Sequence, residues 1–205
     1  FEDVLGKQVL ILDGAMGTMV QNLDLDDAAF GGAAFKMLTD LLIFSRPDDL
    51  EGIHLKYLRA GANLIETDTF GASPLRLQEF DFTQIDLTDI RAIPQDLDLK
   101  ESDYTAITHH LNVQGCRIAR KAIDQYKSEP EYDDRPLFVA GSIGPSNYVI
   151  SKTEADLNKA TWDQIVDNNF QQVKGMIEGG ADVLLFETQQ DILELKASIV
   201  GANKA

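Results

Sequence analysis

Short apolar segments alternate with longer amphipathic ones along this chain, and this alternation limits the possible folds more than any other feature. The apolar segments are residues 8–12, 63–66, 136–140 and 183–186. The amphipathic helical patterns that follow them cover residues 47–61, 105–127, 162–177 and 192–200. Short strands that are apolar throughout are typical of covered parallel sheets, and strand–helix alternation produces right-handed βαβ units. We therefore predict an α/β fold with four βα units and one parallel sheet.

The balance of charge argues against two classes of partner. The 205 residues include 34 Asp and Glu against 18 Lys and Arg, which gives a net charge of −16. Nucleic acids and anionic membrane surfaces are bound by Lys and Arg, so we expect no nucleic acid or membrane partner. No stretch reaches the roughly 18 consecutive apolar residues of a membrane span. The single cysteine, Cys116, cannot form an internal disulfide, so we expect a cytoplasmic protein.

Acidic side chains stand where three of the four predicted strands end: Asp13, Glu66 and Glu187. The carboxyl ends of parallel strands share one edge of the sheet, and ligands bind there. Three acids at one edge would create a negative potential that suits an ammonium group or a metal ion. The alternative for each acid is structural, a carboxylate bonded to neighbouring backbone N–H groups or to an arginine.

Two glycines follow the first of these acids, in the segment Asp13-Gly14-Ala15-Met16-Gly17-Thr18. A tight glycine turn exposes main-chain N–H groups that can bind a carboxylate or a phosphate. The segment lacks the lysine of a P-loop and the glycine spacing of a dinucleotide fingerprint. A turn that only terminates the strand is the alternative.

The stretch from residue 81 to residue 104 departs from the alternation. Between Asp81 and Asp103 it contains seven acids against two basic residues, with one proline and no sustained periodicity. We expect an acidic insertion that forms a solvated excursion on the surface. A lid or a partner-docking loop is the alternative.

Residue types that bind zinc are sparse. Cys116 lies in the middle of a predicted helix, where we expect it to pack in the core, and we expect His54 at the surface. His109 and His110 are adjacent, so on a helix they point about 100° apart and cannot share a metal as an i, i+4 pair could. We therefore expect no metal site in this chain.

Five segments in register resemble the homocysteine-binding domain of cobalamin-dependent methionine synthases. These segments are residues 12–21, 30–32, 61–70, 141–147 and 180–191. The resemblance covers nearly the whole chain and implies a homocysteine S-methyltransferase domain with a (β/α)8 TIM barrel. In that family zinc activates the homocysteine thiol as a thiolate. The thiolate takes a methyl group from methylcobalamin, with 5-methyltetrahydrofolate as the ultimate donor, and methionine is formed.

The resemblance also implies a set of substrate-binding residues. This set is Asp13, Gly14, Ala15, Met16, Gly17, Thr18, Glu66, Asn147 and Glu187. Asp13 and Glu187 would bind the amino group of homocysteine, and the backbone N–H groups of residues 14–18 would bind its carboxylate. Glu66 and Asn147 would shape the same pocket. Members of the family usually have Asn at the position of Asp68.

The three cysteine zinc ligands of the family follow its sixth and eighth strands. We therefore expect residues 1–205 to form the first half of the barrel, four βα units without catalytic residues. Zinc and cobalamin belong to the full-length protein, and we expect neither to bind this fragment. The expected partners are homocysteine, the rest of the barrel and the folate and cobalamin modules, and open strand edges favour self-association. The alternative is a non-catalytic truncated barrel that acts as a small-molecule-binding or scaffold module.

Overall fold

The computed structural model describes residues 1–151 and 158–205 of the chain. Its main sheet consists of β1 (Leu64–Glu66), β2 (Phe138–Ile143) and β5 (Val183–Phe186), which pair in parallel in that order. Three of the predicted strands are thus confirmed. The α/β class and the parallel sheet are confirmed with them.

The first predicted strand, residues 8–12, does not form a regular strand. Leu12 makes one parallel bridge to Leu64, and the carbonyl oxygen of Ile11 accepts the N–H groups of Asn63 and Leu64 at 2.7 and 3.1 Å. The other residues of the run form no ladder bridge. The run therefore lies beside β1 at the edge of the sheet.

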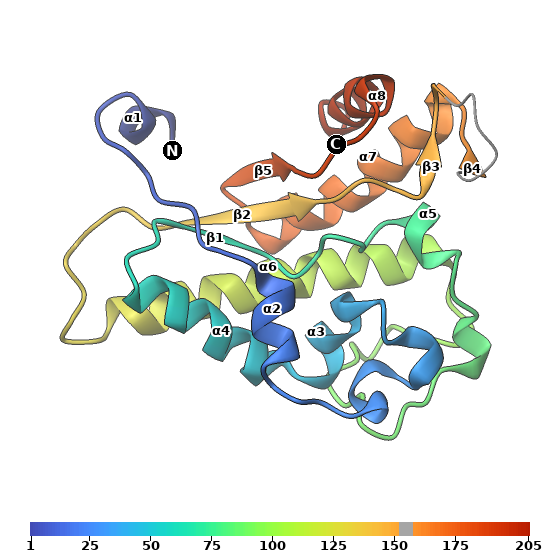
Figure 1. Cartoon of the computed structure of the whole chain (residues 1–205), viewed down its shortest axis with the longest axis horizontal. Coiled ribbons are helices and arrows are strands. Elements are labelled where there is room, and N and C mark those ends of the chain that lie inside the picture. The colour runs from blue at the N-terminus through green and yellow to red at the C-terminus, as the bar shows by residue number, and fades with distance from the viewer. Residues whose placement is uncertain (152–157) are drawn as a thin grey trace.

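Four amphipathic helices connect and cover the strands, as the sequence predicts: α4 (Pro47–Arg59), α6 (Tyr104–Lys127), α7 (Trp162–Gly179) and α8 (Ile192–Ala202). Figure 1 shows α4, α6 and α7 running alongside the strands. Local chemistry sets the limits of α7. It begins with a capping box between Thr161 and Gln164 and ends at Gly180, whose φ of 89° is a left-handed conformation that glycine adopts freely.

Shorter elements that the sequence patterns do not predict fill the connections. The helical ones are α1 (Glu2–Leu5), α2 (Met16–Gln21), η1 (Asp27–Phe30), η2 (Ala33–Phe35), η3 (Thr39–Leu41), α3 (Leu42–Ser45), α5 (Pro74–Leu77) and η4 (Phe82–Gln84). A two-stranded parallel sheet pairs β3 (Tyr148–Val149) with β4 (Asn158–Lys159). Each is too short to show a hydrophobic period. Within residues 1–151 and 158–205, no helix has the length and apolar character needed to cross a lipid bilayer.

Residues 81–104 are not the solvated excursion that their charge suggests. Their acidic side chains reach solvent, but five apolar side chains between them are buried in the core cluster that contains α3. The buried residues are Phe82, Ile85, Ile90, Leu97 and Leu99. The acids alternate irregularly with these residues, so the stretch shows no period although it covers part of the core.

His54 is buried, with 1% of its surface accessible, and the expectation of a surface position is wrong. Its spacing from Leu50 and Leu58 places it on the buried face of α4. Burial lowers the pKa of His54 to about 4, so the imidazole is neutral at pH 7. Cys116 is buried, as predicted.

Two glycines let α7 pack closely against α6. A Cβ atom at Gly175 would lie 2.8 Å from the carbonyl oxygen of His109 and 2.9 Å from Cβ of Asn112. A Cβ atom at Gly179 would lie 2.7 Å from the carbonyl oxygen of Val113. The backbone of α6 cannot turn aside as a flexible side chain could, so the spacing of the two helices depends on these glycines.

We expect Gly175→Ala to lower the free energy of unfolding by about 1–3 kcal/mol, because the added methyl group forces the helices apart. Gly52→Ala is the matched control. It lies in α4 with no atom within 4 Å of the added Cβ, and it should raise the free energy of unfolding by about 0.5–1 kcal/mol. Urea denaturation followed by circular dichroism measures both. Similar effects of the two substitutions would contradict the close packing of α6 and α7.

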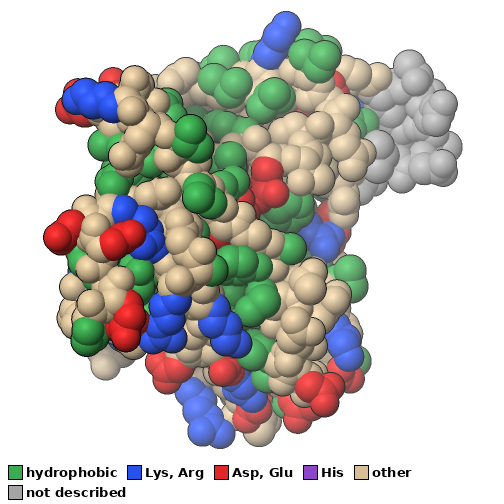
Figure 2. Space-filling model, turned by 60° about the vertical axis from the view of Figure 1, so that its left-hand side comes forward, with side chains coloured by type: hydrophobic (Ala, Val, Ile, Leu, Met, Phe, Trp, Pro, Cys, Tyr) green, Lys and Arg blue, Asp and Glu red, His purple; other side chains and the backbone are tan. Residues whose placement is uncertain are grey.

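The two faces of the sheet differ in their cover. Ile65 and Val139 are fully buried in the core cluster that contains α6 residues. On the other face Leu64 and Leu185 line an apolar cavity of about 240 Å³, which Phe1 and other residues near the N-terminus cover in part. Figure 2 shows hydrophobic side chains reaching the surface in several places. This side of the sheet therefore exposes apolar surface.

We expect this apolar surface to cause self-association. Leu5 lines this cavity and is 56% exposed, and Leu5→Lys should shift the chain toward monomer because it places a charge on this surface. Met37→Lys changes a side chain that is 77% exposed between η2 and η3, and it should leave association unchanged. Sedimentation velocity over a range of concentrations measures both. A wild-type chain that stays monomeric throughout would contradict this expectation.

Candidate functional site

The parallel register brings the carboxyl ends of the strands to one edge of the sheet. Glu66 is the last residue of β1. Glu187 directly follows β5, and its N–H donates to the carbonyl oxygen of Ile143 at the end of β2, at 3.1 Å. Asp13 follows the bridge between Leu12 and β1. The structure thus brings together the three acids that the sequence singles out.

Asp13 is held against β1 by two hydrogen bonds. Its N–H donates to the carbonyl oxygen of Leu64 at 3.0 Å, and its Oδ2 accepts the N–H of Glu66 at 3.0 Å. Its Oδ1 is buried and has no hydrogen-bond partner in the described part of the chain. Burial raises the pKa of Asp13 to about 7, and the charges of Glu66 and Glu187 act in the same direction. A carboxyl in this state gains from a cationic partner.

Glu66 and Glu187 face each other. Burial raises the pKa of Glu66 to about 7, and the carboxyl group of Glu187 raises it further by charge and by a hydrogen bond. Ser142, which is 2% exposed, donates its hydroxyl hydrogen to Oε1 of Glu187 at 2.5 Å. Sequence reasoning does not identify Ser142 as a site residue. The sequence feature that could identify Ser142 is a hydroxyl side chain near the end of an otherwise apolar strand.

The glycine turn lies next to these acids. Helix α2 begins at Met16, so the N–H groups of its first turn have no acceptor within the helix. Tyr57 of α4 donates its hydroxyl hydrogen to the carbonyl oxygen of Ala15 at 3.2 Å, and a Cβ atom at Gly14 would lie 3.2 Å from the Tyr57 ring. Gly14, Ala15, Gly17 and Thr18 are all exposed. The turn therefore packs under Tyr57 and presents its backbone to solvent.

Tyr57 is a site residue that sequence reasoning does not identify. Burial raises the pKa of its hydroxyl, and the charges of Asp13 and Glu66 raise it further, which places the hydroxyl near both acids. In the sequence Tyr57 belongs to the apolar stripe of a helix, and this spacing is typical of a core residue. Nothing in the sequence indicates that the Tyr57 hydroxyl reaches the acids.

The structure does not bring Asn147 to the three acids. Its side chain is exposed, and its amide donates to both carboxylate oxygens of Glu79 at 2.8 Å. Asn147 follows β2 in the chain, but it lies four residues beyond the last strand residue, Ile143. The loop therefore directs it toward the residues after α5.

Asp68 lies in the protein interior beside Asp40. Its Oδ2 is buried without a partner in the described residues. Burial raises the pKa of Asp68, and the charge of Asp40 raises it further. Asp40 accepts the N–H of Gly71 at 2.9 Å, so it fixes the turn that follows β1. Asp68 therefore lies beside the residue that supports this turn, away from solvent.

The residues present do not fit a zinc site. Among the described residues, no three His, Cys, Asp or Glu side chains are arranged to hold a metal ion. Burial raises the pKa of Cys116 to about 12, so its side chain is a thiol. Nε2 of His109 lies 3.4 Å from Glu178, and Nε2 of His110 lies 3.7 Å from Asp96.

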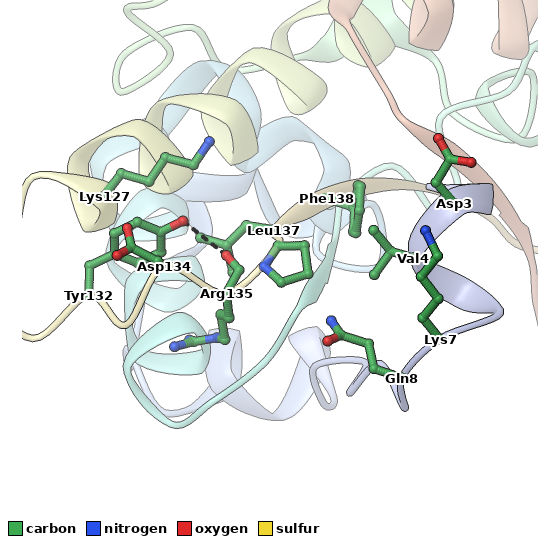
Figure 3. A pocket seen from close by; sticks show the side chains of 11 residues that line it. Asp3, Val4, Lys7, Gln8, Lys127, Tyr132, Asp134, Arg135, Leu137 and Phe138 are labelled. Atoms are coloured by element: carbon green, nitrogen blue, oxygen red, sulfur yellow. Dashed lines mark hydrogen bonds between the residues drawn. The ribbon is translucent and has the colours of Figure 1, made fainter.

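A pocket of about 500 Å³ lies away from the acids, at the amino end of β2. Figure 3 shows Asp3 and Lys7 on one side of it and Lys127 and Tyr132 on the other. The guanidinium group of Arg135 turns away and donates to the carbonyl oxygens of Leu58 in α4 and of Ala62 between α4 and β1. No predicted site residue lines this pocket, and ligands of parallel α/β sheets bind at the opposite, carboxyl edge.

A parallel sheet with acids and a glycine turn at its carboxyl edge defines a class, an α/β domain that binds a small polar ligand at its strand ends. The chain belongs to the homocysteine S-methyltransferase family, whose model matches residues 10–205. The family expected from the five sequence segments is thereby confirmed.

Relatives of known sequence and structure agree with this assignment. Methionine synthase from Mycobacterium tuberculosis (strain ATCC 25618 / H37Rv) is 34% identical over 203 residues, which cover 99% of this chain and 14% of that protein. The metallated form of the homocysteine methyltransferase MmuM from Escherichia coli is 23% identical with a TM-score of 0.71, covering 99% of this chain and 63% of that one. Its apo form gives a TM-score of 0.60 at 23% identity, covering 98% and 57%. The likeness to MmuM supports the fold alone.

The pKa of Glu66 predicts a pH dependence of stability. The pKa is about 7 in the fold against an ordinary value of 4.5, so the contribution of Glu66 to stability is present below pH 4.5 and is lost as the pH rises through 7. Glu66→Gln should reduce the fall in unfolding free energy between about pH 5 and pH 8 by about 1 kcal/mol, because water screens a half-buried group. Urea denaturation at several pH values measures this fall.

Glu101→Gln is the control for this experiment, because Glu101 is exposed and distant in sequence from the strand ends. It should leave the pH dependence unchanged. If Glu66→Gln and wild type lose the same stability between the two pH values, the raised pKa of Glu66 in the fold is contradicted.

Proposed function

We propose that this chain is part of the homocysteine S-methyltransferase domain of a methionine synthase. It would bind homocysteine for methyl transfer from methylcobalamin, with 5-methyltetrahydrofolate as the ultimate donor, to give methionine. The observation that supports this most is the meeting of Asp13, Glu66 and Glu187 beside the turn at residues 14–18, in a chain of this family.

The two ends of the amino acid would bind to different groups. Asp13 and Glu187 would receive the ammonium group, since the buried Oδ1 of Asp13 lacks a partner and Glu187 is close to it. An ammonium group would favour the ionised carboxylates and form charge-assisted hydrogen bonds with them. The N–H groups of Gly14, Ala15, Met16, Gly17 and Thr18 would bind the substrate carboxylate. Asn147 has no part in this proposal because its amide is bonded to Glu79.

The chain would supply the amino-acid site, and the remaining parts of a larger protein would supply the chemistry. It spans 14% of the methionine synthase and 63% of MmuM, and its strand positions suit the first half of a (β/α)8 barrel, which typically has ~250 residues. In the whole protein, zinc would activate the homocysteine thiol as a thiolate. Other segments would supply the zinc ligands and the cobalamin and folate modules. A cytoplasmic location stays a prediction from the single cysteine.

A module that binds homocysteine without catalysis is the second candidate. It needs only the meeting of Asp13, Glu66 and Glu187 at the strand ends and no residue from another segment. The two candidates share the same amino-acid site, so one binding experiment tests the common part.

Homocysteine binding by the 205-residue chain should depend on Asp13. We expect Asp13→Ala to weaken the binding of L-homocysteine by about tenfold or more, because it removes a charge-assisted hydrogen bond to the ammonium group. Isothermal titration calorimetry measures the affinity of both proteins. Asp167→Ala is the control, since it makes the same charge change at an exposed position of α7 and should bind as wild type does. Equal affinities of wild type and Asp13→Ala would remove Asp13 from the site.

A further inference from the structure

Buried hydroxyl groups connect the ends of β1 and β2. Oγ1 of Thr67 and Oγ1 of Thr69 lie 2.6 Å apart, and Thr69 Oγ1 donates to the carbonyl oxygen of Ser142 at 2.9 Å. The N–H of Ser142 donates to Thr67 Oγ1 at 3.0 Å. The exposed fractions of Thr67, Thr69 and Ser142 are 2%, 0% and 2%. Both backbone groups of Ser142 are thus bonded and shielded from water.

Helix α7 supports the same connection. Gln172, which is 1% exposed, donates its Nε2 hydrogen to the carbonyl oxygen of Thr69 at 2.9 Å. Buried hydrogen bonds of this kind make a group costly to displace, because a partner would be left unsatisfied away from water. The hydroxyl group of Ser142 therefore has a fixed position relative to the sheet edge.

This hydroxyl lies closer to the Glu187 carboxylate than the hydroxyl of the neighbouring Thr188 does. Its bond to Oε1 is 2.5 Å long, whereas Thr188 Oγ1 lies 3.4 Å from Oε2. No Lys or Arg side chain within residues 1–151 and 158–205 forms an ion pair with Glu187. A donated hydrogen bond favours the ionised form of a carboxyl group and restricts its rotamer. Ser142 therefore orients the Glu187 side chain, as a neighbouring Lys or Arg does for carboxylates in other sites.

We propose that Ser142 is a positioning residue of the ammonium subsite, where its hydroxyl fixes the carboxyl group of Glu187 beside Glu66, ready to receive the ligand. The inference rests on the proposed function, since the ammonium group is that of homocysteine. The other titratable groups at this edge are Asp13 before α2 and Tyr57 of α4, whose hydroxyl faces Asp13 and Glu66. Burial raises the pKa of Glu66 and the neighbouring Glu187 raises it further, so the pKa of Glu66 reports on the position of Glu187.

The first test uses the free protein. Carboxyl ¹³C NMR titration of the 205-residue chain should show that Ser142→Ala lowers the pKa of Glu66 by about one unit. Without the hydroxyl, Glu187 would turn away from Glu66 and would no longer raise its pKa. Ser142→Thr, which keeps the hydroxyl, should retain the wild-type value. Ser198→Ala is the matched control and should also leave the pKa of Glu66 unchanged. It removes a buried serine hydroxyl that donates to the carbonyl oxygen of Glu194 in α8 and not to Glu187. An unchanged Glu66 pKa in Ser142→Ala would overturn the proposal.

The second test measures the affinity for L-homocysteine by calorimetry. Ser142→Ala should bind about tenfold more weakly than wild type, while Ser142→Thr and Ser198→Ala should bind as wild type does. Equal binding by wild type and a folded Ser142→Ala would overturn the positioning role alone. A wild-type chain that does not bind homocysteine, together with the expected Glu66 titration, would overturn the proposed function and leave the effect of Ser142 on Glu187 established.

Discussion

Parallel pairing of β1 with β2 and of β2 with β5 sets the position of every acid at the candidate site. Glu66 ends one strand, Glu187 follows another, and Asp13 is bonded to the backbone of Glu66. The side chains come from positions far apart in the chain, and only the register of the sheet brings them together. Beside the sheet, α6 and α7 pack closely through Gly175 and Gly179.

The grouping of these acids has an energetic cost. Burial and mutual repulsion raise the pKa of Asp13 and of Glu66 to about 7, so the free site disfavours full ionisation. The hydroxyl of Ser142 offsets this cost at Glu187. An ammonium ligand would offset it at all three acids, so ligand binding and fold stability are linked through the same charges. A site of this kind is less stable when empty than when bound.

The long helices, three strands and the meeting of the three acids are predictable from the sequence, because each depends on a period or on the shared edge of a parallel sheet. Residues 8–12 have a strand-like composition, but of these residues Leu12 alone forms a bridge, to Leu64 of β1. Charge and polarity predict surface positions for residues 81–104 and for His54. The structure buries His54 and the apolar side chains of residues 81–104, and the spacing of His54 from Leu50 and Leu58 is the sequence feature that agrees with its burial. Tyr57 and Ser142 reach the site from a helix and from the interior of a strand, and contacts between distant segments carry no local signal.

The central claim is that the acids at the strand ends hold an ammonium group. Its most direct test compares L-homocysteine with 4-mercaptobutanoate, which has the same thiol and carboxylate but no amino group, in calorimetric titrations of this chain. The account predicts that the analogue binds at least about tenfold more weakly, since it makes no charge-assisted hydrogen bond to Asp13 or Glu187. Equal affinity for the two compounds would contradict the account.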